Sequence, residues 1–309
     1  MGVFDIYGNS LLTPAFANVR DFGATGDGTT DDSSAIQSAL SSIRVTGGMI
    51  YFPAGIYLIK TAVMFYSNQT LFFDGATLKQ GAAIDNLLRS YAESTWTGYD
   101  GVHDVVIYGG TFDGGTYTEN NSLLAFCHAK NIIVDKCTFK NGYGTWHDIE
   151  VNSSYNVKIL NCNLEGSRRT GTNSEMIQVD GAGSASYYPW SGTAIDNTVS
   201  KYIEIAGCIF HDSSYSPGVG NHSDMAHKFV SIHDCVFAGL TSSRGSIIFT
   251  SSVTDVDIYN NTFDNCSSGV ASSGATYYIR GNRFSTVTSP IAGSTSVAHA
   301  NMINGTYTA

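Results

Sequence analysis

Charged side chains are scarce in this sequence: Asp, Glu, Lys and Arg make up 14% of its 309 residues, against about 25% in typical globular domains. Acidic residues outnumber basic ones by 26 to 16, which gives a net charge of −10 and argues against a nucleic-acid partner. No apolar run approaches the roughly 18 residues of a membrane helix. Residues 1–5 hold no basic region that leads into an apolar one. Neither membrane insertion nor a signal peptide is therefore predicted.

Several chemical signatures are missing as well. The sequence contains no Cys-x-x-Cys pair, no Gly-x-Ser-x-Gly turn and no His-Glu-x-x-His segment. A zinc site, a serine-hydrolase elbow and a zinc-protease centre are thus not expected. We predict no cofactor and no metal ion.

What the sequence does contain is a repeat. The spacing apolar, any, apolar, any, any, small, any, large apolar recurs nine times, as in Ile132, Val134, Cys137 and Phe139. Alternating apolar residues predict short strands, and the break before the small residue predicts a tight bend between two of them. The large apolar residues of the nine copies are Tyr57, Leu78, Phe112, Phe139, Leu164, Phe210, Phe237, Phe263 and Phe284.

A repeat of about 25 residues made of short strands is one coil of a solenoid, in which each coil buries its inward side chains against its neighbours. The sequence therefore predicts an all-β, parallel β-helix. Cys137, Cys162, Cys208 and Cys235 fall at the small position of their coils, and Cys266 lies just past a strand. Because free cysteine packs as a small hydrophobe, we expect buried thiols rather than disulfides.

One helix is predicted before the first coils, over about residues 32–45. Asp31 or Asp32 can cap its start, and Gly47 follows its end. This helix can cover the open end of the solenoid. Asp27, Asp31 and Asp32 could form a calcium loop, but a turn followed by a helix cap is the favoured interpretation. The apolar residues that share one helical face are Ala35, Ile36, Ala39, Leu40 and Ile43.

The run from Val19 to Tyr57 includes Phe22-Gly23-Ala24, Asp27-Gly28 and Tyr51-Phe52-Pro53-Ala54-Gly55. With these motifs the sequence resembles the pectate-lyase/polygalacturonase-like right-handed parallel β-helix superfamily, and more narrowly the tailspike-type polysaccharide depolymerases of bacteriophages. The resemblance implies a right-handed β-helix over 19–285, an N-terminal extension over 1–18, and a C-terminal cap or assembly segment over 286–309. Hydrolases, lyases, epimerases and adhesins share this fold, so the reaction must be argued from the site.

Strand register places a polar patch on one outer wall. If Ile149, Val151, Ile177 and Val179 point inward, their neighbours point outward on adjacent coils. The next coil is expected to start near Val219, and in the coil after it Ile248 and Thr250 are expected to point inward. His128 and Lys130, which flank a strand, are expected to face solvent. The polar residues expected on the wall are Asp148, Glu150, Asn152, Glu175, Gln178, Asp180, Asn221, His222 and Asp224.

Two of these carboxylates have a separation that suits glycoside hydrolysis. Glu150 lies beside Gln178 on the next coil, about 4.8 Å away, and Asp180 lies two residues, about 6.7 Å, further along. The diagonal of about 8 Å falls within the roughly 6.5–9.5 Å typical of inverting glycosidases. We predict Glu150 and Asp180 as the acid/base pair, with Asp148 as a replacement for either, and Glu175 and His222 in support.

Aromatic and basic residues near this patch can bind sugar. An insertion containing Tyr187, Tyr188, Pro189 and Trp190 can wall a groove, and Tyr143 and Trp146 can extend the platform. The expected sugar contacts are Arg168, Arg169, Gln178, Tyr143, Trp146, Tyr188, Trp190 and Asp224.

Departures from the known motifs leave alternatives open. Asp180 and Gly220-Asn221-His222 are loose echoes of the polygalacturonase motifs, and no Arg-Ile-Lys is present. Tyr143-Gly144 before His147-Asp148 is similar to the active-site strand of alginate epimerases and lyases, although the spacing differs. Two alternatives to the hydrolase remain. One is a lyase or uronate epimerase, in which Arg168 or Arg169 neutralises a uronate. The other is a non-catalytic glycan-binding adhesin.

The resemblance to tailspikes implies a setting. We expect a virion component made in host cytoplasm, which acts on a bacterial surface polysaccharide; an extracellular protein is the alternative. A homotrimer that contacts other tail proteins is expected by resemblance.

Overall fold

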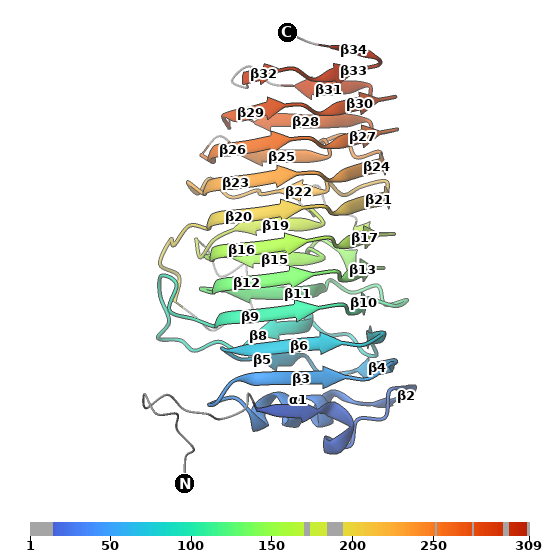
Figure 1. Ribbon diagram of the computed structural model, residues 1–309, viewed down its shortest axis with the longest axis vertical. Helices are drawn as coiled ribbons and strands as arrows, with labels where there is room; N and C mark the ends of the chain where they lie inside the picture. Colours follow the sequence, from blue (N-terminus) through green and yellow to red (C-terminus); the bar gives the residue numbers. More distant parts are fainter. Residues whose placement is uncertain are drawn as a thin grey trace, which may run out of the picture.

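The chain winds into a right-handed parallel β-helix (Figure 1). The computed structural model describes residues 15–169, 174–183, 194–250, 252–273, 275–292 and 297–307. Within these residues, three long sheets of 11, 12 and 9 strands follow the spiral, and each middle coil contributes one strand to each of them.

The first sheet faces the viewer in Figure 1. It consists of β1 (Phe16–Asn18), β3 (Gly48–Phe52), β6 (Gln69–Phe73), β9 (His103–Tyr108), β12 (Lys130–Asp135), β16 (Tyr155–Leu160), β20 (Lys201–Ala206), β23 (Lys228–His233), β26 (Thr254–Tyr259), β29 (Tyr277–Arg280) and β32 (Val297–His299).

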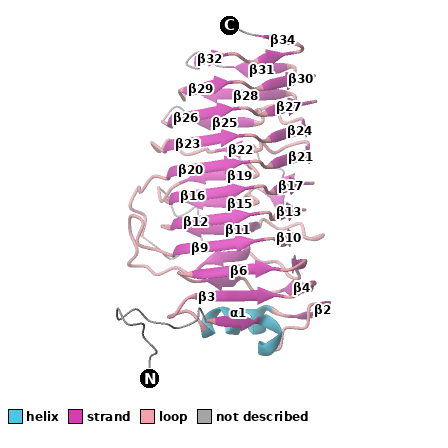
Figure 2. Cartoon of the chain, in the orientation of Figure 1, coloured by secondary structure: helices cyan, strands magenta, loops and turns pink. Residues whose placement is uncertain are grey.

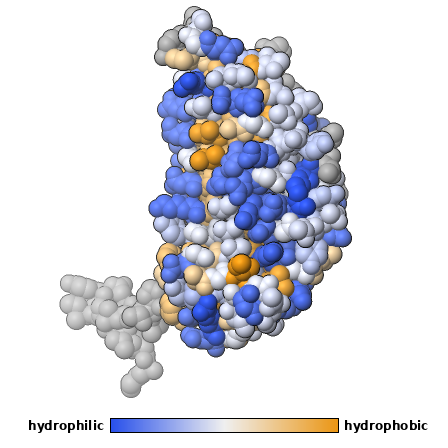
Figure 3. All heavy atoms as spheres, turned by 90° about the vertical axis from the view of Figure 1, so that its right-hand side faces the viewer, coloured by the Kyte–Doolittle hydropathy of each residue, from blue (hydrophilic) through white to orange (hydrophobic). Residues whose placement is uncertain are grey.

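The second sheet forms the side that Figure 3 turns toward the viewer, where a short hydrophobic stripe interrupts a largely hydrophilic surface. It consists of β2 (Asp27–Asp31), β4 (Gly55–Ile59), β7 (Ala76–Gln80), β10 (Thr111–Asp113), β13 (Thr138–Lys140), β17 (Asn163–Glu165), β21 (Ile209–Ser213), β24 (Val236–Leu240), β27 (Thr262–Asp264), β30 (Arg283–Ser285), β33 (Met302–Ile303) and β34 (Thr306–Tyr307).

The third sheet lies behind the first one in Figure 1 and carries the candidate site. It consists of β5 (Val63–Phe65), β8 (Asn86–Ser90), β11 (Ser122–Cys127), β15 (Ile149–Asn152), β19 (Ile177–Asp180), β22 (Val219–Gly220), β25 (Ile247–Thr250), β28 (Ser268–Ser273) and β31 (Ser289–Ala292). A small additional sheet pairs β14 (Tyr143–Gly144) with β18 (Arg168–Arg169).

The predicted bend lies between the first and second sheets. Its sharpness comes from the residue before the small position, which adopts a left-handed backbone conformation, as at Asn161 (φ 53°) and Gly207 (φ 64°). Asn and Gly tolerate this region better than other residues. The repeat therefore encodes the bend as well as the strands.

Inward side chains stack in columns along the axis. The ring centroids of Phe210 and Phe237 are 4.7 Å apart, and those of Phe237 and Phe263 are 4.8 Å apart. These distances equal the spacing of hydrogen-bonded strands. Full burial of each phenylalanine contributes roughly 1.5–3 kcal/mol to stability, so the column is a large part of what holds the coils together.

The small position forms a hydrogen-bonded ladder. The Cys162 backbone N–H donates to Cys208 Sγ, and the Cys208 N–H donates to Cys235 Sγ, both at 3.4 Å. Further along, the Cys235 N–H donates to Asn261 Oδ1 at 2.9 Å, and Asn282 continues the pattern. The cysteines are free and buried, as predicted.

The N-terminal end carries helix α1 (Ser33–Ser42), preceded by the 3₁₀ turn η1 (Val19–Phe22) (Figure 2). Ile36, Ala39 and Leu40 are fully buried beneath the first coils. The three aspartates of the possible calcium loop accept backbone N–H groups, which fits the favoured turn interpretation: Asp27 from Thr29, Asp31 from Ser33 and Asp32 from Thr25. At the other end, coils continue past Ser285 to β33 and β34, which pair antiparallel.

Two sequence expectations about individual residues were wrong. In β25, Ile247 and Phe249 point inward and are fully buried, so the expected inward pair Ile248 and Thr250 is out of register by one residue. His128 is buried rather than exposed to solvent: its ring nitrogens lie 2.7 Å from the Gly98 carbonyl oxygen and 3.2 Å from that of Ala194.

His128 thereby joins two long connections that leave the spiral on the same side (Figure 1). The Gly98 N–H also donates to Asp196, and the Tyr99 hydroxyl donates to the Val199 carbonyl. None of the described helices is long and apolar enough to cross a bilayer.

Candidate functional site

Polar side chains are buried on the outer side of the third sheet in its middle coils. All four residues of β15 and all four of β19 are buried, whereas the outward residues of β12 in the first sheet are half-buried or exposed. The register pairs Glu150 with Gln178 and Asn152 with Asp180. The predicted acidic wall is therefore present on adjacent strands, and most of its side chains are buried.

Asp148 and Arg169 form a fully buried ion pair, with Arg169 Nη2 2.8 Å from Asp148 Oδ1. Arg169 also donates to the carbonyl oxygens of Asn121 and Tyr143. Burial raises the pKa of Asp148 and outweighs the opposing charge of Arg169. A Cβ at Gly142 would collide with both partners, so glycine is required there. Arg169 has no exposed surface, and its expected contact with sugar is thus wrong for this conformation.

Arg168 is occupied in a similar way. Its Nη2 donates to the carbonyl oxygens of Gly115, Tyr117 and Asn141, at distances of 2.8–3.1 Å. The guanidinium lies over the Tyr143 ring, 5.4 Å from its centroid. Arg168 therefore connects three turns, and its half-buried side chain leaves the predicted sugar contact a prediction.

Glu175 lies at the centre of a second group of charged residues. His222 Nδ1 is 3.4 Å from Glu175 Oε2, and Arg244 Nη1 is 2.8 Å from Glu175 Oε1. His147 Nδ1 donates to the Glu175 carbonyl oxygen at 2.9 Å. Burial opposes ionisation, but the hydrogen bond from His222 and the nearby cations lower the pKa of Glu175 below its usual range. This carboxylate is therefore ionised at neutral pH.

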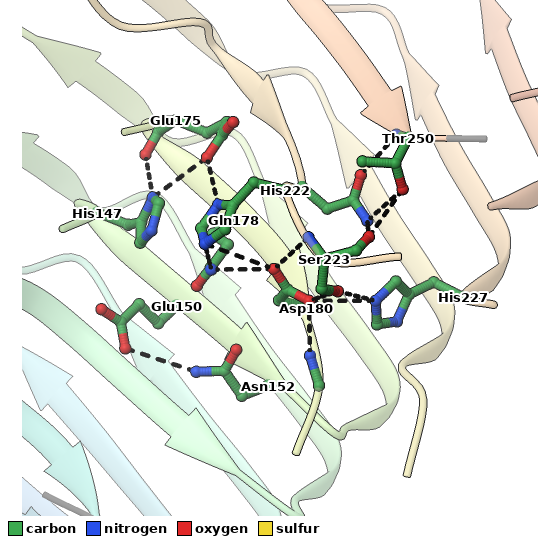
Figure 4. Close-up of polar contacts among 12 residues, drawn as sticks. His147, Glu150, Asn152, Glu175, Gln178, Asp180, His222, Ser223, His227 and Thr250 are labelled. Carbon is green, nitrogen blue, oxygen red and sulfur yellow. Dashed lines mark hydrogen bonds and ion pairs between the residues drawn. The ribbon is translucent and has the colours of Figure 1, made fainter. Parts of the chain in front are cut away.

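Asp180 is saturated with hydrogen-bond donors (Figure 4). It accepts from the backbone N–H of Gly181 at 3.1 Å, from the hydroxyl of Ser223, and from Gln178 Nε2 at 3.2 Å. His227 Nε2 lies 3.4 Å from Asp180 Oδ1. Burial raises the pKa of Asp180, but these donors more than compensate and lower it overall.

The histidines differ in protonation. Burial is the main cause that lowers the pKa of His147 to about 4, so this ring is neutral at physiological pH. For His222, burial acts in the same direction, but Glu175 and Asp180 outweigh it and raise the pKa. At His227, Nδ1 accepts the Ser200 backbone N–H at 2.9 Å, so the proton resides on Nε2, facing Asp180.

Among the histidines and carboxylates of this network, His222 has the most exposed side chain. Its side chain is 15% exposed, whereas those of Glu175 and Asp180 are 0% exposed. Nδ1 faces Glu175, and Nε2 lies 3.8 Å from Asp180 Oδ2 and 3.4 Å from Gln178 Nε2. The ring also stacks on His147, with centroids 5.5 Å apart. His222 is therefore held by several neighbours, while part of its side chain stays exposed.

Glu150 is nearly buried and lies next to neutral groups. It accepts a hydrogen bond from the Ser122 hydroxyl, and Asn152 Nδ2 is 3.5 Å from its second oxygen. Figure 4 places it on the same side of the sheet as Gln178, below His147. The structure thus brings Glu150, Asp180, Glu175 and His222 onto one wall.

The other expected site residues are dispersed. Tyr143 and Trp146 are half-buried near this wall, and Asp224 is exposed beyond β22. Tyr188 and Trp190 lie outside the described residues.

Sequence reasoning missed His147, Ser223, His227 and Arg244 as members of the network. Arg244 is the one charged residue in a small, polar turn before β25, and His227 directly precedes β23. Both positions carried a weak signal, since an isolated charged or imidazole side chain next to a strand has to find a partner.

His147, Glu175 and His222 also place three potential metal-ligand atoms within 4.8 Å of one another. A divalent cation there would compete with Arg244 for Glu175 and with the hydrogen bond of His147 to the Glu175 carbonyl. The arrangement suits proton transfer better than metal binding.

The fold and this wall define the class: a pectate lyase-like parallel β-helix protein with a polar network on one lateral sheet. The chain belongs to the rhamnogalacturonase A/epimerase, pectate lyase-like family, whose model matches residues 16–291. The superfamily expected from the sequence is confirmed.

Among individual proteins, plasmin and fibronectin-binding protein A of Streptococcus pneumoniae is 28% identical over 319 aligned residues, which cover 91% of this chain. The chain spans 41% of that relative's length. The crystal structure of that protein, a surface adhesin, superposes with a TM-score of 0.75 at 21% identity and covers 93% of this chain and 78% of that one.

Two further solved structures share the fold. An exopolygalacturonase from Thermotoga maritima has a TM-score of 0.67 at 18% identity and covers 91% of this chain and 76% of that one. ORF18 of Geobacillus virus E2 has a TM-score of 0.59 at 17% identity and covers 90% of this chain and 58% of that one. At these identities the likeness concerns the fold.

Proposed function

We propose that this protein binds a polysaccharide along the outer wall of the third sheet and hydrolyses it. The observation that carries the proposal is the group of four buried carboxylates, two arginines and three histidines gathered on β15, β19 and their neighbours. Buried charges are expensive to maintain, and here several of them lie together on adjacent coils. Clustered groups with shifted pKa values are typical of catalytic sites.

Glu150 acts as the general acid in this proposal. Its neighbours Ser122 and Asn152 are neutral, and its carboxyl group is nearly buried. In this role the carboxyl group donates its proton to the leaving glycosidic oxygen.

His222 acts as the general base, a role that the sequence had suggested for Asp180. Asp180 is fully buried and occupied by donors, so it has no surface for a water molecule. His222 is accessible, and Glu175 accepts from its Nδ1, which leaves Nε2 to take a proton from water. Asp180 then stabilises the imidazolium, as a positioning residue.

Sugar contacts are proposed for the half-buried Tyr143 and Trp146 and for the exposed Asp224. Gln178, expected from the sequence to contact sugar, is buried and donates to Asp180, so it supports the wall instead. Tyr188 and Trp190 remain proposed contacts from the connection between β19 and β20. Asp148 supports the wall through Arg169.

A second function is favoured by one specific observation. The relative that aligns with 91% of this chain is a binding protein of the pneumococcal surface, so an adhesin without turnover is the main alternative. A lyase or uronate epimerase is a further alternative, because His147 and Tyr143 lie beside the wall. Arg169 is buried against Asp148, so the half-buried Arg168 is the arginine that would neutralise a uronate there.

For the setting, we propose a virion tail component or an extracellular protein. The first follows from the resemblance to tailspikes, and a protein of Geobacillus virus E2 shares the fold; the pneumococcal surface adhesin supports the second. A homotrimer with further tail proteins as partners remains part of the first proposal.

The experiment is an assay of new reducing ends and of ultraviolet absorbance across a panel of bacterial capsular and wall polysaccharides. Hydrolysis gives reducing ends without absorbance; a lyase gives both, and an adhesin gives binding alone. With an active polysaccharide, the acid limb of the kcat/KM profile should lie above about pH 6.5, because the pKa of His222 is raised and the base must be neutral. A limb below about pH 4 would identify Asp180 as the base instead.

A further inference from the structure

Two aromatic residues on the first sheet occupy a backbone conformation that bulky side chains seldom adopt. Tyr202 (φ 57°) and Phe229 (φ 59°) are the second residues of β20 and β23, and both lie in the left-handed region. This region costs a bulky residue conformational free energy. The repeat is therefore interrupted here by residues that the fold itself does not favour. At the same position, the neighbouring coils carry side chains that tolerate the conformation better, namely Asp104, Asn131, Asn156 and Asp255.

The two rings stack on each other at the surface. Their centroids are 4.7 Å apart with 16° between the ring planes, yet Tyr202 is 47% exposed and Phe229 is 43% exposed. On its other side Tyr202 contacts Tyr155 of β16, the next strand of the sheet in Figure 1, with centroids 5.1 Å apart. Tyr202 is thus covered on both sides, and its ring edge is the part that remains exposed. Beside the rings lies a shallow hollow of about 210 Å³.

A lysine precedes each of these aromatic residues. Lys201 and Lys228 lie directly opposite each other on β20 and β23, and like charges in this arrangement repel each other. The carboxylate on the same strand, Glu204, already pairs with Lys158 at 2.6 Å and lies 3.4 Å from His233. Among the residues that the structure describes, neither Lys201 nor Lys228 lies within ion-pair distance of a carboxylate. Two neighbouring positive charges therefore face outward without a counter-charge, in a chain whose net charge is −10.

We call Lys201, Tyr202, Lys228 and Phe229 the lysine–aromatic patch. Ammonium groups and the positive edges of aromatic rings both attract carboxylate oxygens. A sugar ring would stack on an aromatic face, and the faces of Tyr202 are covered. Carboxylates on an extended peptide are about 6.7 Å apart at every second residue, which suits two flexible lysines on strands about 4.8 Å apart. The patch therefore fits an acidic peptide better than a sugar.

We propose that the lysine–aromatic patch is a docking surface for an acidic peptide segment of a partner protein. Lys201 and Lys228 pair with two carboxylates of the segment, which removes the repulsion between the two ammonium groups. Tyr202 and Phe229 contact its apolar side chains, as exposed aromatic residues commonly do at protein interfaces. The patch lies on the first sheet and the candidate site on the third, so this inference is independent of the proposed hydrolysis.

The binding test uses the full chain and three fluorescently labelled peptides, followed by fluorescence anisotropy. The acidic and apolar probe is Leu-Glu-Glu-Leu-Glu-Glu. Its matched peptides are Leu-Gln-Gln-Leu-Gln-Gln, which lacks the charges, and Ser-Glu-Glu-Ser-Glu-Glu, which lacks the apolar groups. The probe should bind at least tenfold more tightly than the neutral peptide and at least threefold more tightly than the serine peptide. Its affinity should also fall at least threefold from about 50 mM to about 300 mM NaCl, because salt screens exposed charges.

The sharpest variant replaces both aromatic residues by asparagine, the residue that neighbouring coils use at this position. Tyr202→Asn combined with Phe229→Asn should bind the probe at least fivefold more weakly, while Tm should not fall, because Asn tolerates the left-handed conformation better. Lys201→Gln combined with Lys228→Gln should weaken binding at least tenfold. The stability readout separates a docking role from a structural one, since a structural role of the rings would lower Tm.

Two matched controls should bind the probe as the unaltered protein does. Tyr278→Asn removes an aromatic residue of the same sheet that is 46% exposed, and Lys79→Gln removes a half-buried lysine on the second sheet. Unchanged probe binding in either double variant, equal binding of the neutral peptide, or displacement of the probe by maltohexaose would overturn the proposal. Self-association that the double asparagine variant abolishes would overturn it as well, because a second copy of this chain would then occupy the patch.

Discussion

This spiral contains two arrangements of buried polar side chains, one that repeats from coil to coil and one that does not. The ladder from Cys162 to Asn282 repeats one contact in coil after coil: a small side chain accepts the N–H of the coil before it. The wall on β15 and β19 repeats nothing, since each coil contributes different polar residues with different partners. Repetition along a solenoid thus marks a contribution to stability, and its interruption marks a candidate for function.

The difference extends to charge. The residues of the ladder are uncharged, and they form hydrogen bonds with one another at the same position of successive coils. The wall contains ion pairs whose partners come from turns and connections, such as Arg169 and Arg244. Its stability therefore depends on segments outside the repeat.

The largest expected effect on stability concerns the buried ion pair of the wall. Replacing Arg169 with Leu leaves the Asp148 carboxylate buried without a counter-charge, which should cost about 3–5 kcal/mol in the free energy of unfolding. Arg280→Leu is the matched control, because Arg280 pairs with Asp257 at 2.7 Å but is 43% exposed in its side chain. That change should cost less than about 1 kcal/mol. Equal losses in chemical denaturation would show that burial of the pair has no special role.

The second expected effect is a loss of stability at acid pH that comes from His147 in the wall. The pKa of His147 is about 4 in the folded protein, below the usual 6.5 of the unfolded chain. The unfolded state therefore takes up the proton first, and stability falls as the pH drops from about 6.5 to about 4, by up to roughly 3 kcal/mol. His147→Asn should lack this part of the acid sensitivity. Denaturation curves at pH 7 and pH 4.5 measure it, and the same pH dependence in both proteins would contradict the assignment.

A smaller effect is expected in the ladder. Asn261→Ala removes the acceptor of the Cys235 N–H and the donor to the Ile232 carbonyl, so two buried groups lose a partner. The loss should be about 2 kcal/mol or somewhat more. Asn163→Ala, on the outer face of β17 and half-buried, should lose less than about 1 kcal/mol. If the two variants unfold alike, the ladder contributes no more than surface contacts do.

The same contrast explains what the sequence could predict. The repeat predicted the strands, the bends, the free cysteines and the pairing of Glu150 with Gln178. It could do so because the same spacing recurs in every coil and therefore gives the strand register each time. The register failed at β25, where Ile247, Ile248 and Phe249 are all apolar and either parity fits an inward face. In a run of consecutive apolar residues, alternation cannot show which side chains point inward.

The residues that bind the carboxylates of the wall could not be predicted from the sequence, for a different reason. His227, Ser223 and Arg244 act on Asp180 and Glu175 from turns and connections, whose paths no periodic pattern specifies. Arg168 and Arg169 were assigned to sugar because their sequence position lies near the wall, whereas their guanidinium groups turn inward to carbonyl and carboxylate oxygens. Sequence shows which residues share a wall but not which of them remain accessible.

The most direct test of the account compares Glu150→Gln with Asn261→Ala, each measured for cleavage of an active polysaccharide and for thermal unfolding. We expect each substitution to affect one of the two measurements and to spare the other. Glu150→Gln should lose about 10²–10⁴-fold in kcat with little change in Tm, and Asn261→Ala should lower Tm while the folded protein keeps its kcat. Retained kcat in the Glu150→Gln protein, or a loss of kcat and Tm together in both proteins, would contradict the separation between a repeating scaffold and a non-repeating site.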